Sequence, residues 1–158
     1  MKTTIIQKPS FMVVGVSLET LLQDEREQRN IPKLHQKFNE RIAEITNRIN
    51  DNAIGIFIDP PNYSYKLDKF KWIAGVEVTG MDELPEGMEA VSFPANTYAC
   101  VTYKGKKNQA YQAYDYLYQW VAESEYELAD TYGVEHYKEY DEETAEEIMD
   151  LMFPVKKK

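Results

Sequence analysis

The sequence contains few of the residues that disulfides and metal sites require. Its 158 residues include one cysteine, Cys100, and two histidines, His35 and His136. A single cysteine cannot form an intrachain disulfide, and it is typical of proteins in a reducing compartment. Zinc needs cysteine or histidine ligands at set spacings, which two separated histidines do not supply. We therefore expect a cytoplasmic protein that holds no metal.

Three further absences narrow the class of protein. No apolar run approaches the ~18 to 20 residues of a membrane span, and residues 1–8 lack the apolar core of a secretion signal. The glycine-rich loops that cradle nucleotide phosphates do not occur, and no serine lies in a nucleophile-elbow sequence. The sequence therefore predicts no membrane contact, no cofactor and no catalytic residues.

Basic residues are outnumbered by acidic ones. Lysine and arginine together number 18 and aspartate and glutamate 27, which gives a net charge of −9. Direct nucleic-acid binding needs a concentrated basic face, so this balance argues against it and suits cationic or neutral partners. The sequence is instead rich in tyrosine, with 12 Tyr against 6 Phe and 2 Trp. Tyrosine suits a wall that is apolar and must also form hydrogen bonds.

The length predicts a single domain over residues 1–158. Runs of β-branched and apolar residues predict strands at residues 10–18, 53–58 and 70–79, the last ending at Gly80. The first strand contains Gly15, at a bulge or a close approach between strands. A helix is predicted between the first two strands by apolar residues at helical spacing, which are Leu34, Phe38, Ile42, Ile45 and Ile49.

The second half repeats this order. Strands are predicted at residues 90–103, with a bend at Pro94, and at residues 134–140 and 148–155, with a helix at residues 110–122. The chain thus has two strand–helix–strand–strand (SHS2) repeats, about 1–85 and 86–158. We expect an α+β fold with one antiparallel sheet, two helices on one face and a ligand cleft on the other.

Two glutamates lie inside otherwise apolar strands. Glu77 lies in the strand at residues 70–79, and Glu135 shares one face of its strand with Tyr137 because side chains alternate with a period of two. One interpretation places each glutamate on a solvated sheet face. The other places it at the floor of an aromatic cleft, where a lipophilic cation would be its countercharge and aromatic faces would add cation–π attraction.

Several other side chains are expected at the surface. His35 lies off the apolar stripe of the first helix. Residues 141–147 are interpreted as a solvated acidic turn, and the lysines at residues 156–158 as a solvated tail. Packing and surface roles are expected for the tyrosines of the second helix, which are Tyr111, Tyr114, Tyr116 and Tyr118.

Six segments in this order resemble the GyrI-like small-molecule-binding domain, the effector-binding domain of bacterial AraC-type and MerR-type regulators. They are residues 11–15 (FMVVG), 56–60 (IFIDP), 72–78 (WIAGVEV), 93–99 (FPANTYA), 134–137 (VEHY) and 153–155 (FPV). The resemblance implies a ligand cleft between the two halves, in which an acidic residue among aromatic rings binds lipophilic, often cationic, compounds, as in multidrug binding.

The resemblance also implies a set of ligand-binding residues. Glu135 and Tyr137 match the family's Glu-x-Tyr strand position, and Phe57 matches the aromatic residue before its Asp-x-Pro turn. Trp72 and Tyr98 fall in the strands that line the cleft, and Glu77 matches a recurring glutamate. The sequence shows no helix-turn-helix region, so we expect a stand-alone domain with a small-molecule ligand and no direct nucleic-acid contact.

Three functional hypotheses follow. The leading one is binding or sequestration of an amphipathic, cationic or aromatic small molecule, with Glu135 as countercharge. The second is hydrolysis of a reactive small molecule, with Glu135 as general base and Tyr137 as hydrogen-bond donor. The third is binding of a protein partner, as in gyrase inhibition, through the acidic segments at residues 123–130 and 141–147.

Overall fold

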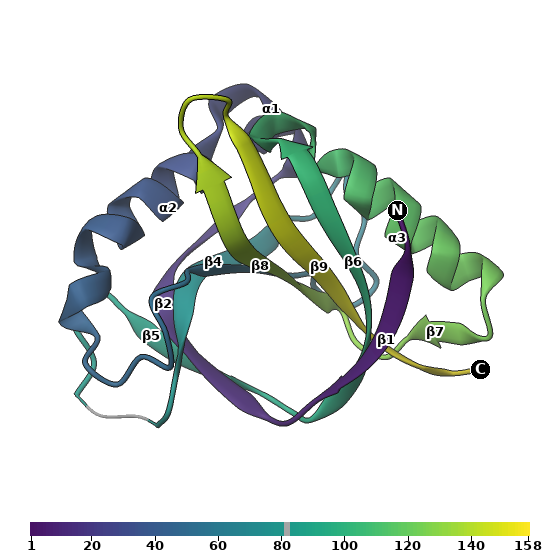
Figure 1. The fold of residues 1–158 in the computed structure, drawn as a ribbon, viewed down its shortest axis with the longest axis horizontal. Coiled ribbons are helices and arrows are strands. Elements are labelled where there is room, and N and C mark those ends of the chain that lie inside the picture. Colours follow the sequence, from purple (N-terminus) through teal and green to yellow (C-terminus); the bar gives the residue numbers. More distant parts are fainter. Residues whose placement is uncertain (81–82) are drawn as a thin grey trace. The chain divides into compact units, whose positions relative to one another are not determined.

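A computed structural model describes residues 1–80 and 83–158, apart from the side chain of Asn108. Of the loop predicted after Gly80, residues 81 and 82 lie outside the described residues. The described chain forms nine strands and three α-helices, which is the α+β class predicted (Figure 1). It divides into two compact units: unit 1 consists of Met1–Pro9 and Ala95–Lys158, and unit 2 of Ser10–Pro94.

Unit 2 is an antiparallel sheet with two helices. Its strands pair in the order β3-β4-β2-β5. Their bounds are β2 (Phe11–Thr20), β3 (Ile54–Ile58), β4 (Phe70–Val78) and β5 (Glu89–Phe93). The helices are α1 (Leu22–Gln28) and α2 (Asn30–Arg41), and a 3-10 turn, η1 (Ile42–Glu44), follows α2.

The core of unit 2 lies between α2 and one face of this sheet. Phe38 of α2 and Ile45 after it pack against a patch of small and β-branched residues on β2 and β4, among them Val14 and Val76. Gly15 lies opposite Gly75, and a Cβ atom on Gly15 would lie only 2.1 Å from the Ala74 carbonyl oxygen. Gly15 therefore marks a close approach between strands, one of the two roles predicted for it.

Unit 1 is built in the same way. Its strands pair in the order β1-β6-β9-β8, all antiparallel, and β7 pairs with the C-terminal end of β9. Their bounds are β1 (Thr3–Lys8), β6 (Asn96–Lys106), β7 (Tyr126–Leu128), β8 (Tyr132–Asp141) and β9 (Glu146–Lys157). A 3-10 turn, η2 (Lys107–Gln109), leads into α3 (Tyr111–Glu123). Figure 1 shows β8, β9 and β6 side by side with α3 alongside β6.

Both units contain the strand–helix–strand–strand order, as β2-α2-β3-β4 and β6-α3-β8-β9. Each unit also contains an edge strand that the predicted boundary at residue 85 assigned to the other half: β1 precedes unit 2 in sequence yet pairs with β6, and β5 lies beyond residue 85 yet pairs with β2. The single bent strand predicted at residues 90–103 is therefore two strands that belong to different units. They separate at Pro94, which has no backbone N–H to continue a ladder.

Some elements differ from the sequence-based expectations. The strand β1, the short helix α1 and the strand β7 were not predicted, and the first helix ends at Arg41 rather than continuing to Ile49. The closing lysines are solvent-exposed, as predicted, but they do not form a free tail. Residues 156 and 157 belong to β9, and the Lys158 ammonium donates hydrogen bonds to the carbonyls of Ser124 (2.9 Å) and Ala122 (3.4 Å) at the C-terminal end of α3. A cation is favourable there because helix carbonyls point outward at that end.

Among the described residues, no helix is both long and apolar enough to cross a lipid bilayer. The same residues contain no group of three or more histidine, cysteine, aspartate or glutamate side chains that could hold a metal ion.

Candidate ligand site around Glu135

Strand register places the candidate site on the face of the unit 1 sheet that α3 covers. Glu135 of β8 lies opposite Leu151 of β9, and Tyr137 lies opposite Met149. Alternate residues of β9 share this face, so Glu147 and Phe153 also point to it. The helix α3 reaches the same face, because the Tyr114 hydroxyl donates a hydrogen bond to Glu135.

Two tyrosine hydroxyls hold the Glu135 carboxylate. Tyr137 donates to Oε1 at 2.6 Å, and Tyr114 donates to Oε2. The Glu135 side chain is half-buried. Desolvation raises the pKa of its carboxyl, and the two hydrogen bonds oppose that rise. Among residues 1–80 and 83–158, no lysine, arginine or histidine forms an ion pair with Glu135. The carboxylate therefore has hydrogen-bond donors but no countercharge.

The same environment keeps both tyrosines protonated. Burial, and then the nearby charge of Glu135, raise the pKa of Tyr114 and of Tyr137 well above the usual value for a phenol. A phenol that does not ionise remains a hydrogen-bond donor throughout the physiological range. The two hydroxyls therefore stabilise the ionised form of Glu135 over the neutral one.

Aromatic rings and a strand irregularity surround this carboxylate. The ring of Phe153 lies 6.0 Å from that of Tyr114 and 4.5 Å from that of Tyr118, measured between centroids. The pairing of β8 with β9 shifts between Tyr137 and Glu139, where one extra residue forms a bulge. Bulges re-aim side chains and are common beside binding sites.

A second carboxylate, Glu147, lies on the same face. Its side chain is only 8% exposed. Burial, and then the charge of Glu135, raise the pKa of Glu147 to about 7, and Lys107 opposes the rise. Residues 141–146 are exposed, as the interpretation of residues 141–147 as a solvated turn predicts, but Glu147 is buried. The turn is also shorter than predicted, because β8 ends at Asp141 and β9 begins at Glu146. The alternation of the strand could have predicted this burial, since Glu147 lies two positions before Met149 and four before Leu151, and side chains at this spacing point to the same face.

Tyr114 was also missed as a site residue. It shares the apolar face of α3 with Leu117 and Val121, so packing alone explained its position. A tyrosine on such a face needs a partner for its hydroxyl, and here that partner is Glu135.

The proposed residue Tyr98 lies on the other face of the unit 1 sheet. It pairs with Pro154, while Glu135 pairs with Leu151, so their side chains point to opposite faces. Tyr98 is fully buried, and its hydroxyl shares a hydrogen bond of 2.8 Å with the Tyr132 hydroxyl. The structure of unit 1 therefore does not bring Tyr98 to the Glu135 carboxylate.

In unit 2, Phe57 and Trp72 are direct neighbours on β3 and β4, and both are buried. The Trp72 indole N–H donates to Nε2 of His35 on α2 at 3.0 Å. His35, which was expected at the surface, is half-buried and contacts the sheet, and its ring must present a lone pair at Nε2. Glu77 lies an odd number of positions after Trp72 on β4, so its side chain points to the opposite face of the sheet, where it is partly exposed.

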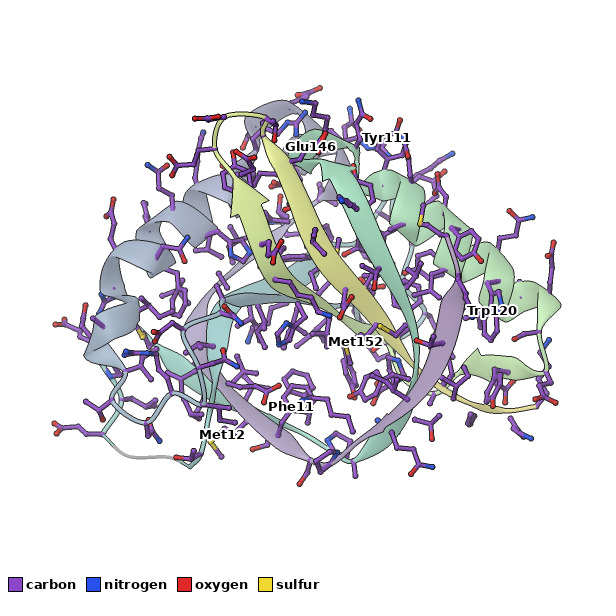
Figure 2. All side chains as sticks on the ribbon, in the orientation of Figure 1. Phe11, Met12, Tyr111, Trp120, Glu146 and Met152 are labelled. Carbon is purple, nitrogen blue, oxygen red and sulfur yellow. The ribbon has the colours of Figure 1, made fainter. Side chains whose placement is uncertain are left out.

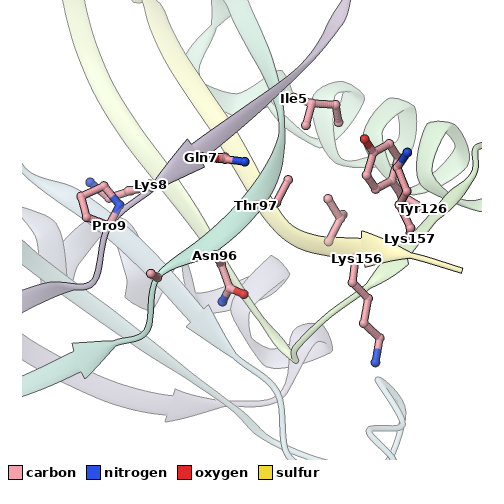
Figure 3. A pocket seen from close by; sticks show the side chains of 11 residues that line it. Ile5, Gln7, Lys8, Pro9, Asn96, Thr97, Tyr126, Lys156 and Lys157 are labelled. Carbon is pink, nitrogen blue, oxygen red and sulfur yellow. The ribbon is translucent and has the colours of Figure 1, made fainter.

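An open groove of about 950 Å³ lies elsewhere in unit 1 (Figure 3). It is lined by the ends of β1, β6 and β9 and contains none of the site residues named above. Lys8, Lys156 and Lys157 are among its lining residues, and no carboxylate is. A groove of this charge does not suit a cationic ligand.

A model of the GyrI-like small-molecule-binding domain matches residues 1–156, and the chain belongs to this family. It is therefore a small-molecule-binding domain by family. It is 29% identical over 119 residues to the transcriptional regulator BrlR of Pseudomonas aeruginosa, an alignment that covers 75% of this chain and 41% of BrlR.

Two solved structures share the fold. The structure of SAV2435 bound to tetraphenylphosphonium has a TM-score of 0.76 at 15% identity and covers 99% of this chain and 94% of that one. EcmrR in a DNA complex has a TM-score of 0.74 at 19% identity and covers 99% of this chain and 58% of that one. The chain thus spans about two-fifths of BrlR and under two-thirds of EcmrR.

Proposed function

We propose that this domain binds amphipathic, lipophilic cations, with Glu135 as the countercharge and the rings around it as an apolar wall. The observation that supports the proposal is the state of Glu135. Its carboxylate is half-buried and accepts hydrogen bonds from two tyrosines, and no cation among the described residues pairs with it.

The physical argument concerns the balance of charge in the site. A carboxylate withdrawn from water is stable only with hydrogen bonds or a positive partner. Tyr114 and Tyr137 supply hydrogen bonds in the empty site. A bound cation would add the missing charge, and each aromatic face in contact with it would contribute cation–π attraction of ~0.5 to 2 kcal/mol.

Family and fold support the same ligand class. The chain is a GyrI-like small-molecule-binding domain, and SAV2435, which shares the fold, is bound to tetraphenylphosphonium, a lipophilic cation. Phe57, Trp72, Tyr98 and Glu77 remain proposed ligand contacts on the strength of the family resemblance. A role in transcription regulation, which BrlR suggests, and a cytoplasmic location, which the single cysteine suits, belong to the same proposal.

Calorimetry with tetraphenylphosphonium tests the proposal. We expect Glu135→Gln to weaken binding roughly 10- to 100-fold, which corresponds to the ~1.5 to 3 kcal/mol of a hydrogen bond to a charged group. Glu139→Gln is the matched control, because Glu139 lies on the same strand, makes the same change of charge and is exposed. Equal affinities for the two variants would remove Glu135 from the role.

The same variants separate the other two hypotheses. A hydrolase would form product from a strained electrophile and lose that activity in Glu135→Gln, and Glu147 supplies a second carboxyl group for acid–base chemistry. If the domain is instead a protein-interaction module, its affinity for the partner should be unchanged by Glu135→Gln and should decrease as the salt concentration rises. The acidic surface for such a partner is reduced, because Glu125 and Glu127 lie 3.7 and 4.0 Å from the ammonium groups of Lys157 and Lys156.

A further inference from the structure

Glu147 is a largely buried residue whose carboxyl group forms no hydrogen bond. The residue is only 8% exposed, and among the described residues it forms no hydrogen bond and no ion pair. It lies opposite Tyr140 on one side and Gly105 on the other, two positions along β9 from Met149. Figure 2 labels the preceding residue, Glu146, where β9 leaves its turn with β8. Partial desolvation without a hydrogen-bond donor or a cation favours the protonated form of such a carboxyl group over the ionised one.

The surroundings of Glu147 hold more negative than positive charge. Glu147 pairs with Tyr140 on β8, and Glu135 lies on the same face of the sheet, opposite Leu151, near enough for the charges of the two glutamates to interact. The charge of Glu147 also acts on Tyr137 of β8 and on Tyr103 of β6, and Tyr111 of α3 lies near Tyr103. The one cation near it within the described chain is Lys107, whose ammonium lies 5.2 Å from the Tyr140 ring centroid. Glu135 has two hydroxyl donors and Glu147 has none, so the negative charge of the pair belongs on Glu135.

We propose that Glu147 holds a proton while the site is empty and releases it when a lipophilic cation binds beside Glu135, so that binding exchanges one cation for one proton. This inference rests on the function proposed above. The proton leaves to the solvent, no bond of the ligand changes, and the net charge of the site is conserved. Two carboxyl groups that share a desolvated space titrate as a pair, and an added positive charge favours ionisation of the second one.

The pH range of this exchange follows from the environment of Glu147. Burial and the charge of Glu135 raise its pKa to about 7. We therefore expect close to one proton released per ligand near pH 6, about half a proton near pH 7, and almost none at pH 9. Because a proton is released, a higher pH favours binding, and the affinity should increase about fivefold between pH 6 and pH 7, about tenfold between pH 6 and pH 8, and level off above pH 8.

The first test measures proton release. Titration of the full chain with tetraphenylphosphonium in two buffers of different ionisation enthalpy gives the number of protons released per ligand. We expect release from the wild type and from Glu146→Gln, an exposed neighbour with the same change of charge, and no release from Glu147→Gln, which still binds the cation. Release that persists in Glu147→Gln, or binding by the wild type without release near pH 6, would overturn the inference.

The second test needs no ligand. In the infrared spectrum of the ligand-free protein, a protonated-carboxyl band should disappear as the pH rises from 6 to 8, and Glu147→Gln should lack it. In Glu135→Gln the midpoint should fall, because the charge that raises the pKa of Glu147 is gone. A missing band contradicts the inference. A normal band without any binding of tetraphenylphosphonium contradicts the proposed function and the exchange but leaves the proton on Glu147.

Discussion

The two units follow one repeat but use the face beneath the helix differently. In unit 2, α2 covers apolar side chains of β2 and β4, and Phe38 is completely buried among them. In unit 1, α3 covers a face that contains Glu135 and Glu147, and the Tyr114 hydroxyl donates a hydrogen bond to Glu135. The repeat therefore tolerates ionisable groups at its helix–sheet interface. We infer that the interface of unit 2 contributes more to the free energy of unfolding than that of unit 1, where the proposed binding site replaces apolar contacts.

Truncation of the two helix–sheet interfaces should show the largest difference. Phe38→Ala should lower the free energy of unfolding by about 3 to 5 kcal/mol, because it leaves a cavity in a closed core. Tyr118→Ala in α3 should cost only about 1 to 2 kcal/mol, since Tyr118 is 42% exposed and packs its ring on that of Phe153.

Urea denaturation measures both variants, with Leu67→Ala as the control for an apolar truncation at the surface of unit 2, where Leu67 is 82% exposed. Equal losses for Phe38→Ala and Tyr118→Ala would show that the two interfaces contribute alike, which would break the comparison.

The second effect is a dependence of stability on pH that Glu147 should introduce in unit 1, whereas in unit 2 the carboxyl group whose pKa burial raises, to about 6, is Asp59. The pKa of Glu147 is about 7 in the fold and near 4.5 when exposed. The protonated form is thus favoured by folding, so its stabilising contribution is complete below about pH 4.5 and is lost as the pH rises through 7. The loss amounts to about 3 kcal/mol.

Denaturation of the wild type and Glu147→Gln at pH 5 and pH 8 measures this contribution. The wild type should lose stability relative to the variant as the pH rises, whereas Glu146→Gln should follow the wild type. Parallel pH profiles for the wild type and Glu147→Gln would place Glu147 in contact with water.

The smallest effect concerns the hydrogen bond from the Trp72 indole N–H to Nε2 of His35, which joins α2 to its sheet. His35→Leu removes the acceptor and should lower the free energy of unfolding by about 1 kcal/mol. His35→Gln is the control, because its side-chain oxygen can accept the same hydrogen bond. Urea denaturation measures both variants, and in a Trp120→Phe background the fluorescence of Trp72 should report the loss of the contact. Equal stabilities for His35→Leu and the wild type would show that this hydrogen bond does not stabilise unit 2.

Local patterns in the sequence were sufficient for much of the fold and part of the site. Alternation in β8 placed Glu135 and Tyr137 on one face, and their hydrogen bond lies within a single strand. The partner Tyr114 comes from a helix twenty-one positions earlier, and no local pattern distinguishes a tyrosine that packs from one that also donates to a carboxylate.

The other differences also depend on distant contacts. β1 has an unremarkable sequence and becomes a strand because β6 pairs with it. His35 is off the apolar stripe of α2, yet a tryptophan thirty-seven positions later brings it to the sheet. Glu147 was obscured by its acidic neighbours, since composition alone does not show where a turn ends and a buried strand begins.

The pairing of β1 with β6 has a consequence for synthesis. Unit 2 is continuous, so all its strands have left the ribosome soon after Pro94 is added. Unit 1 is interrupted by unit 2: β1 is synthesised before unit 2, whereas its partner β6 and the next strand of the sheet, β9, are synthesised after it. Domains fold as units during translation, so we expect unit 2 to become structured first and residues 3–8 to remain unpaired until β6 and β9 have emerged. The unit that contains Glu135 and Glu147 is thus expected to form after the other.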